Sequence, residues 1–170
     1  MSSNNPVNFE ELVAQHYRGL FQFALSLTGA EAEACDLTQQ TFLIWARKGS
    51  QLREAGKAKS WLFTTLHREF LQSKRRQTRF PHIELDAAAN EMPTLAPEVV
   101  NALDGGAVMD TLAQVDEIYR APLALFYLED LAYKDIAEVL GVPVGTVQSR
   151  IARGKAQLAT LLHTKEVNRG

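Results

Sequence analysis

Residues 131–155 read LAYKDIAEVLGVPVGTVQSRIARGK, and this stretch decides how the chain is interpreted. Ile136 and Leu140 keep helical spacing and are followed by Gly141, which takes the left-handed conformation at a helix end without steric cost. Pro143 has a fixed φ and lacks an N–H group, so it suits the start of a second helix. Two helices joined by so short a turn have the layout of a DNA-binding helix-turn-helix.

The second helix of this pair has an apolar stripe and a free polar face. Residues 144–165 hold four basic residues and no acidic one, whereas residues 108–143 hold seven acids and two bases. A solvated helix in an ordinary bundle would explain the charges alone. The turn glycine, the proline and the charge segregation together favour DNA binding. The candidate DNA contacts are Thr146, Gln148, Ser149, Arg150, Arg153 and Lys155.

Length and composition predict a small all-helical protein. The 170 residues suit one domain or two small ones, at ~100–200 residues per domain. The sequence has no run of eighteen apolar residues and no signal-peptide pattern at its start, so we expect a cytoplasmic chain without direct membrane insertion. Cys35 is the single cysteine and the four histidines are scattered, so no cofactor and no metal are expected. No phosphate-binding, zinc-protease or nucleophile-elbow motif occurs, which argues against an enzyme.

The net charge of −2 hides an uneven distribution. Residues 1–76 carry ten bases and seven acids, residues 77–107 one and five, and residues 108–170 seven and eight. The middle segment also contains three prolines and a Gly-Gly pair and lacks a sustained helical stripe. We therefore predict an N-terminal helical bundle (1–76) and a C-terminal four-helix domain with the helix-turn-helix (108–170). A flexible acidic linker (77–107) would let them move independently.

Helical periodicity predicts three helices in the first domain, over residues 9–27, 30–47 and 57–76. Residues 47–76 contain nine bases and two acids with aromatic residues between them, a combination that suits single-stranded DNA. The alternative is that Trp61, Leu62, Leu66 and Phe70 are core residues of a small bundle. The candidate strand contacts are Lys57, Lys59, Trp61, Thr64, Thr65, Arg68, Lys74, Arg75 and Arg76.

Three segments together resemble bacterial extracytoplasmic-function sigma factors. They are DLTQQTFLIWA (36–46), KSWLFTTLHREFLQSKRR (59–76) and YRAPLALFYLEDLAYKDIAEVLGVPVGTVQSRIARGKAQL (119–158), and the resemblance extends over residues 9–162. It implies two helical domains that bind core RNA polymerase, one melting and holding the −10 promoter element and one docking on the −35 element. It also implies an anti-sigma factor as a partner.

By this resemblance the second helix meets the polymerase clamp. The implied contacts are Asp36, Leu37, Gln39, Gln40 and Phe42. The loop at residues 49–56 would capture a flipped-out base of the −10 element, and residues 61–76 would hold the opened strand. The predicted duplex contacts on the last helix would read the −35 element.

Four positions depart from the family pattern. Cys35 and Gln40 stand where the family often has acids, so the clamp contact is less dependent on charge. Glu69 replaces a common Asn; its carboxylate repels phosphate but can accept from a cytosine amino group. Gln148 replaces a common Arg, and Gln can read adenine with two hydrogen bonds.

Two other classes of protein share parts of this pattern. A two-domain adaptor or anti-activator would use its helices to bind proteins and would not need the cationic, aromatic third helix. A dimeric repressor would read duplex DNA through paired half-sites, but the sequence shows no evident dimerisation helix or ligand-binding domain.

Overall fold

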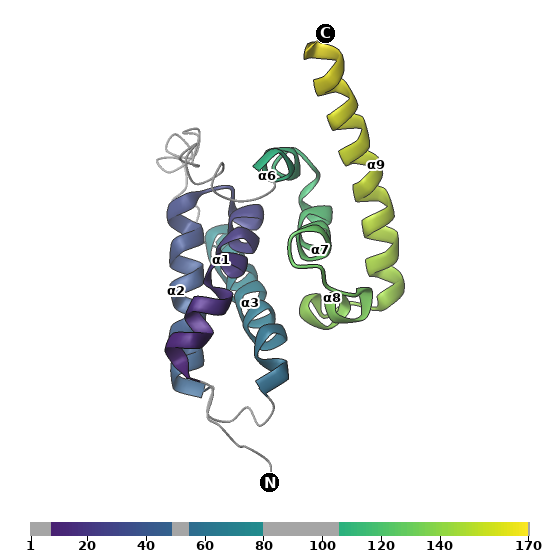
Figure 1. The fold of residues 1–170 in the computed structure, drawn as a ribbon. Coiled ribbons are helices and arrows are strands. Elements are labelled where there is room, and N and C mark those ends of the chain that lie inside the picture. Colours follow the sequence, from purple (N-terminus) through teal and green to yellow (C-terminus); the bar gives the residue numbers. More distant parts are fainter. Residues whose placement is uncertain (1–7, 49–54, 80–105, 170) are drawn as a thin grey trace.

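The computed structural model describes residues 8–48, 55–79 and 106–169, and every regular element within them is helical. The elements are α1 (Phe9–Thr28), α2 (Glu31–Lys48), the 3₁₀ turn η2 (Ala55–Lys57), α3 (Ala58–Arg79), α6 (Gly106–Leu112), α7 (Glu117–Tyr127), α8 (Tyr133–Leu140) and α9 (Val144–Arg169) (Figure 1). The predicted all-α class is confirmed. The predicted flexible linker falls largely on residues 80–105, which lie outside the described residues.

The first three helices form a bundle, drawn from purple to teal in Figure 1. Asn8 caps α1 by accepting a hydrogen bond from the Glu10 N–H at 2.9 Å, and Gly29 ends the helix with a left-handed φ of 68°. The core of the bundle includes Phe23 and Phe63, whose ring centroids lie 5.5 Å apart. The local signals in the sequence thus placed both ends of α1 within a residue.

The last four helices form the helix-turn-helix domain, drawn from green to yellow. Gly141 ends α8 with a φ of 67° and donates its N–H to the Ala137 carbonyl. After Pro143, α9 begins at once, and the Val147 N–H donates to the Pro143 carbonyl at 3.2 Å. The predicted helix, tight turn and second helix are confirmed.

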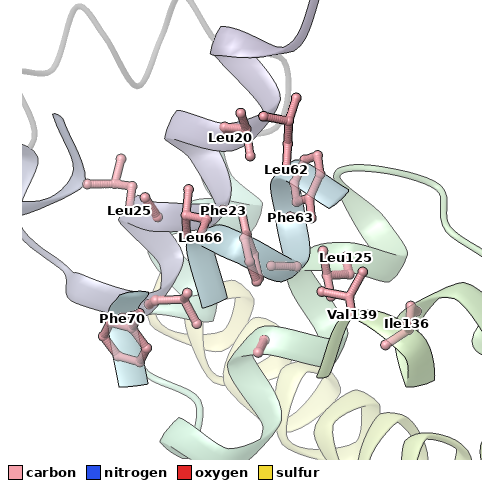
Figure 2. Close-up of a cluster of buried hydrophobic side chains, with 14 of the residues drawn as sticks. Leu20, Phe23, Leu25, Leu62, Phe63, Leu66, Phe70, Leu125, Ile136 and Val139 are labelled. Carbon is pink, nitrogen blue, oxygen red and sulfur yellow. The ribbon is translucent and has the colours of Figure 1, made fainter. Parts of the chain in front are cut away.

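The two groups of helices pack against each other, α1 on α7 and α3 on α8. Figure 2 shows Phe63 and Leu66 from the first group in one hydrophobic cluster with Leu125, Ile136 and Val139 from the second. All five side chains are nearly or completely inaccessible to solvent. In this structure the two groups of helices are therefore joined by a common core; that they can move independently stays a prediction.

The predicted ends of the linker need correction. Residues 77–79 continue α3, and residues 106–107 already belong to α6. At the first end residues 77–79 are polar and compatible with a helix, and α3 continues through Arg79. At the second end the Gly-Gly pair was taken as part of the linker, but Gly106 is the first residue of α6.

Candidate nucleic-acid interface

Helix α9 presents one exposed face beside a buried one. Gln148, Ser149 and Arg153 are exposed, whereas Val147 and Ile151 are 0% and 1% exposed and pack into the domain. The exposed amide, hydroxyl and guanidinium groups can donate hydrogen bonds to base edges and phosphates in a major groove. Three of the six predicted duplex contacts thus share a free surface.

The other three predicted duplex contacts, Thr146, Arg150 and Lys155, are half-buried at the edges of this face. The Lys155 ammonium lies 4.6 Å from the centroid of the Phe126 ring, an arrangement that holds the cation by its attraction to the ring face. Arg150 lines a cavity of about 470 Å³ between the two groups of helices. In this conformation Arg153 is therefore the most accessible of the three basic candidates on α9.

Gly154 explains how closely α9 can approach α7. A Cβ atom at this position would lie 2.6 Å from Leu123 Cδ1 and 2.9 Å from Leu123 Cγ. Leu123 is completely buried, so its side chain cannot turn outward. The sequence did not reveal this contact, because Leu123 lies thirty-one positions earlier in the chain.

Helix α3 carries most of the predicted strand contacts on the side opposite its core. Leu62 and Leu66 are 0% exposed, while the arginines Arg68, Arg75 and Arg76 are exposed. Helical spacing places Trp61, Thr64 and Thr65, all half-buried, on the arginine side, and Lys57 is exposed in the turn before α3. We call these seven residues the outward face of α3: Lys57, Trp61, Thr64, Thr65, Arg68, Arg75 and Arg76.

Trp61 has a partner within the bundle, since its ring meets that of Trp45 edge-on with centroids 5.0 Å apart. The alternative core interpretation is confirmed for Leu62, Leu66 and Phe70, all of which are buried. Trp61 is half-buried, so part of its surface remains available for stacking. The outward face therefore joins cations to a partly exposed aromatic ring.

Lys59 and Lys74 lie on the other side of α3, where the second group of helices packs. The Lys59 ammonium lies 3.4 Å from a carboxylate oxygen of Glu129, and Lys74 forms an ion pair with Glu117. Burial lowers the pKa of Lys74, and the nearby Arg120 guanidinium lowers it further. The two lysines are thus engaged by acidic residues of the helix-turn-helix domain.

His67 also faces this contact between the domains. Burial lowers the pKa of its imidazole, and the Arg150 guanidinium from α9 lowers it further. His67 and Arg150 both line the cavity of about 470 Å³ described above, together with Lys74, Glu117 and Arg120. A residue of α3 and a residue of α9 are therefore electrostatically coupled.

The predicted polymerase-binding set divides on α2. Asp36, Gln39 and Gln40 are exposed and Leu37 is half-buried, but Phe42 is only 5% exposed. The Phe42 ring stacks on Tyr17 with centroids 6.2 Å apart. The assignment of Phe42 as a surface contact is therefore corrected to the core of the bundle.

Leu43, which is 54% exposed, was not among the predicted contacts on α2. It follows Gln39 by four residues and Gln40 by three, so it extends the same exposed face of α2. Helical spacing alone would have placed this leucine among polar residues, which is the sequence signal for an exposed apolar contact.

The predictions of a base-capturing loop, of no metal site and of no membrane insertion concern the whole chain, of which the structure describes a part. The predicted base-capturing loop lies mainly at residues 49–54, outside the described residues. Within the described ranges no cluster of three or more metal-ligating side chains occurs. No described helix is long and apolar enough to cross a membrane.

Comparison with known families gives two matches that divide the chain as its charge does. The model described as Sigma-70 region 2 matches residues 12–80, and that described as Sigma-70, region 4 matches residues 105–158. The chain is 34% identical over 143 residues to the ECF RNA polymerase sigma factor SigL of Mycobacterium tuberculosis, a match that covers 82% of this chain and 80% of SigL. It is 33% identical over 165 residues to SigE of Mycolicibacterium smegmatis, with 94% of this chain and 64% of SigE covered.

Solved structures support the same relation. The sigma factor RpoE of Bartonella quintana, in complex with the anti-sigma factor NepR, superposes with a TM-score of 0.73 and 26% identity. That match covers 91% of this chain and 96% of RpoE. CnrH, in complex with the cytosolic domain of CnrY, superposes with a TM-score of 0.62 and 27% identity, covering 92% of this chain and 88% of CnrH.

Proposed function

Because this chain belongs to the extracytoplasmic-function family of RNA polymerase sigma factors, we propose that the surfaces described above bind core polymerase and promoter DNA. Proteins of this family are transcription initiation factors that recognise promoters. Residues 1–76 are assigned to the −10 element and to polymerase, and residues 108–170 to the −35 element. The carrying observation is the pair of separate exposed faces, one on α3 and one on α9.

The exposed face of α9 is assigned to the −35 duplex. Gln148 and Ser149 lie near the N-terminal end of the helix, the part of a recognition helix that reaches base edges. Gln148 can pair with adenine through two hydrogen bonds, and Arg153 can contact guanine or phosphate. Thr146, Arg150 and Lys155 flank this face and join the contact when their present neighbours release them.

The outward face of α3 is assigned to the opened strand of the −10 element. Its three exposed arginines neutralise phosphates, and the accessible part of Trp61 offers a surface on which a base can stack. Lys59 and Lys74 are on the opposite side and reach the strand only after the helix-turn-helix domain has moved away. The −10 assignment thus rests mainly on the outward face.

The exposed face of α2 is assigned to polymerase. Asp36, Gln39 and Gln40 supply hydrogen-bonding groups, and Leu43 supplies an apolar centre between polar neighbours. The uncharged Gln40 stands where the family often has an acid, so this contact depends less on salt. Leu37 contributes its accessible edge.

The same proposal includes the chain's cellular setting. A sigma factor acts where RNA polymerase acts, so the chain is assigned to the cytoplasm and to a non-enzymatic role. The RpoE and CnrH structures contain partner proteins named NepR and CnrY. By that likeness an anti-sigma factor is assigned as a partner of this chain.

Run-off transcription tests the function directly. Purified core polymerase is incubated with the full chain and a promoter library in which the −35 and −10 elements are randomised. The proposal predicts transcripts that require this protein and enrich particular sequences at both elements. An adaptor or a repressor yields no protein-dependent transcript, and that outcome refutes the proposal.

A further inference from the structure

Glu129 lies in the short connection between α7 and α8, where the backbone holds it in a defined direction. Asp130 adopts a left-handed φ of 54°, and the Leu131 N–H donates to the Leu125 carbonyl at 3.2 Å. This hydrogen bond, which spans a left-handed residue, ties the connection back to a carbonyl of α7. The helix end thus fixes the backbone from which the Glu129 side chain projects.

Two groups of Glu129 hold one ammonium of the other domain. The Lys59 Nζ donates to the Glu129 backbone carbonyl at 3.3 Å and lies 3.4 Å from its carboxylate Oε2. The Glu129 side chain is only 11% exposed. A charge so enclosed requires a partner, and Lys59 supplies it from α3.

Gly19 of α1 forms the third side of this contact. A Cβ atom on Gly19 would lie 2.5 Å from Oε1 of Glu129 and 2.9 Å from Oε2. Any residue other than glycine would displace the carboxylate from its place against α1. Glu129 therefore contacts two helices of the N-terminal bundle at once. It lies against α1 at Gly19, which has no side chain, and it pairs with the Lys59 ammonium of α3.

We propose that Glu129, seated on Gly19 and paired with Lys59, is an interdomain lock that holds this sigma factor in a closed, promoter-incompetent state. The inference rests on the proposed function. The −35 and −10 elements are centred about 25 base pairs apart, or ~85 Å at ~3.4 Å per base pair. In the closed state α3 packs on α8 and α8 on α9, so about two interhelical distances of ~8–10 Å separate α3 from α9.

Both elements cannot be read across so short a separation, so the Glu129 contact must break before the two faces reach their sites. Opening also releases Lys59, which is a predicted contact of the −10 strand. The lock thus withholds a strand-binding cation for as long as the domains stay closed. Binding of core polymerase and promoter DNA to the separated domains would supply the free energy for opening.

The distance between the domains in the full chain tests the lock without polymerase. Cys35→Ser removes the native thiol, and Ala46→Cys and Ala159→Cys place spin labels at exposed sites on α2 and α9. Pulsed electron spin resonance of the otherwise unchanged chain should give a short, single distance distribution. Gly19→Ala and, separately, Glu129→Lys should each add a population at longer distance.

Matched variants separate the lock from general effects. Gly145→Ala is a helical glycine substitution with nothing within 4 Å of the new methyl, and Asp110→Lys makes the same charge change at an exposed site on α6. Both should keep the single short distance. Circular dichroism shows whether each variant retains its helices.

The outcomes divide clearly. If Gly19→Ala and Glu129→Lys keep the short distribution while folded, or if their controls open equally, the lock does not exist. Run-off transcription is a separate measurement, because a chain without sigma activity can still show the lock. Conversely, an active sigma factor with unchanged distances refutes the lock and leaves the proposed function intact.

Discussion

The close approach of α9 to α7 predicts the effect of Gly154→Ala. Alanine is favoured over glycine in a helix interior by ~1 kcal/mol, which by itself would stabilise the protein. The new methyl, however, would lie 2.6 Å from Leu123 Cδ1 in a fully buried site, and overpacking of a core typically costs ~1–3 kcal/mol. The second effect is larger, so we expect net destabilisation of about 1 kcal/mol.

Urea denaturation followed by circular dichroism measures this difference. A loss of ~1 kcal/mol lowers the melting temperature of a chain of this length by ~2–4 °C. Gly145→Ala on the same helix is the control, because nothing lies within 4 Å of its methyl. It should be neutral or slightly stabilising. The reasoning is refuted if Gly154→Ala is as stable as Gly145→Ala.

A second substitution tests whether Leu123 is the cause. Leu123→Ala alone leaves a cavity and should cost ~2–5 kcal/mol. When Leu123→Ala is combined with Gly154→Ala, the new methyl on α9 occupies part of that cavity and no longer overlaps the leucine side chain. The double variant should therefore lose less stability than the two single losses added together. Simple additivity would assign the Gly154→Ala effect to some other contact.

Three further predictions concern binding and pH. Arg153→Ala should weaken binding of the full chain to duplex promoter DNA and reduce the slope of log K against log salt by about 1, whereas Lys48→Ala, which removes an exposed cation from the end of α2, should leave both unchanged. Equal slopes for Arg153→Ala and the parent would remove Arg153 from the interface. Alanine at the three arginines of the outward face, Arg68, Arg75 and Arg76, should reduce permanganate reactivity of unpaired promoter thymines more than it reduces core-polymerase binding. Normal reactivity would refute the −10 assignment. The pKa of His67 is lowered by burial and by Arg150, so the closed contact is favoured above the ordinary histidine pKa of ~6.5 and should weaken as pH falls below it. Glu129 acts in the opposite direction at lower pH, because burial raises its pKa and the closed form holds the proton more tightly. Interdomain distances measured from about pH 7.5 to about pH 5.5, a range that spans the ordinary histidine pKa, should lengthen, less so in His67→Gln; an unchanged distribution would contradict this.

Much of the fold was predictable because its signals are local. Gly29 and Gly141 end their helices with positive φ, as a glycine after an apolar helical stripe indicates. Pro143 precedes a helix because its ring fixes φ near the helical value and it has no N–H to leave unsatisfied. Such features depend on neighbours within a few positions, so the sequence contains the whole cause.

The contacts between the domains were not predictable in the same way. Gly19 and Glu129 are far apart in the chain, and no sequence pattern links the two. A glycine inside a helix and an acid in a turn have many ordinary explanations. Only their meeting in space shows that each requires the other, and that Lys59 completes the contact.

The third helix shows how far a charge count can be trusted. The nine basic residues at 47–76 predicted a single cationic surface, but helical spacing places Lys59 and Lys74 with the buried Leu66 and Phe70 rather than with Arg68. That division was available from the sequence, since it follows from the period of an α-helix. The helical period does not show what packs on each side of the helix. Acidic residues of the helix-turn-helix domain cover the side with the two lysines and leave the side with the arginines open. A basic helix that packs on another domain therefore has to be counted face by face, and here the face that remains free is the one carrying the arginines.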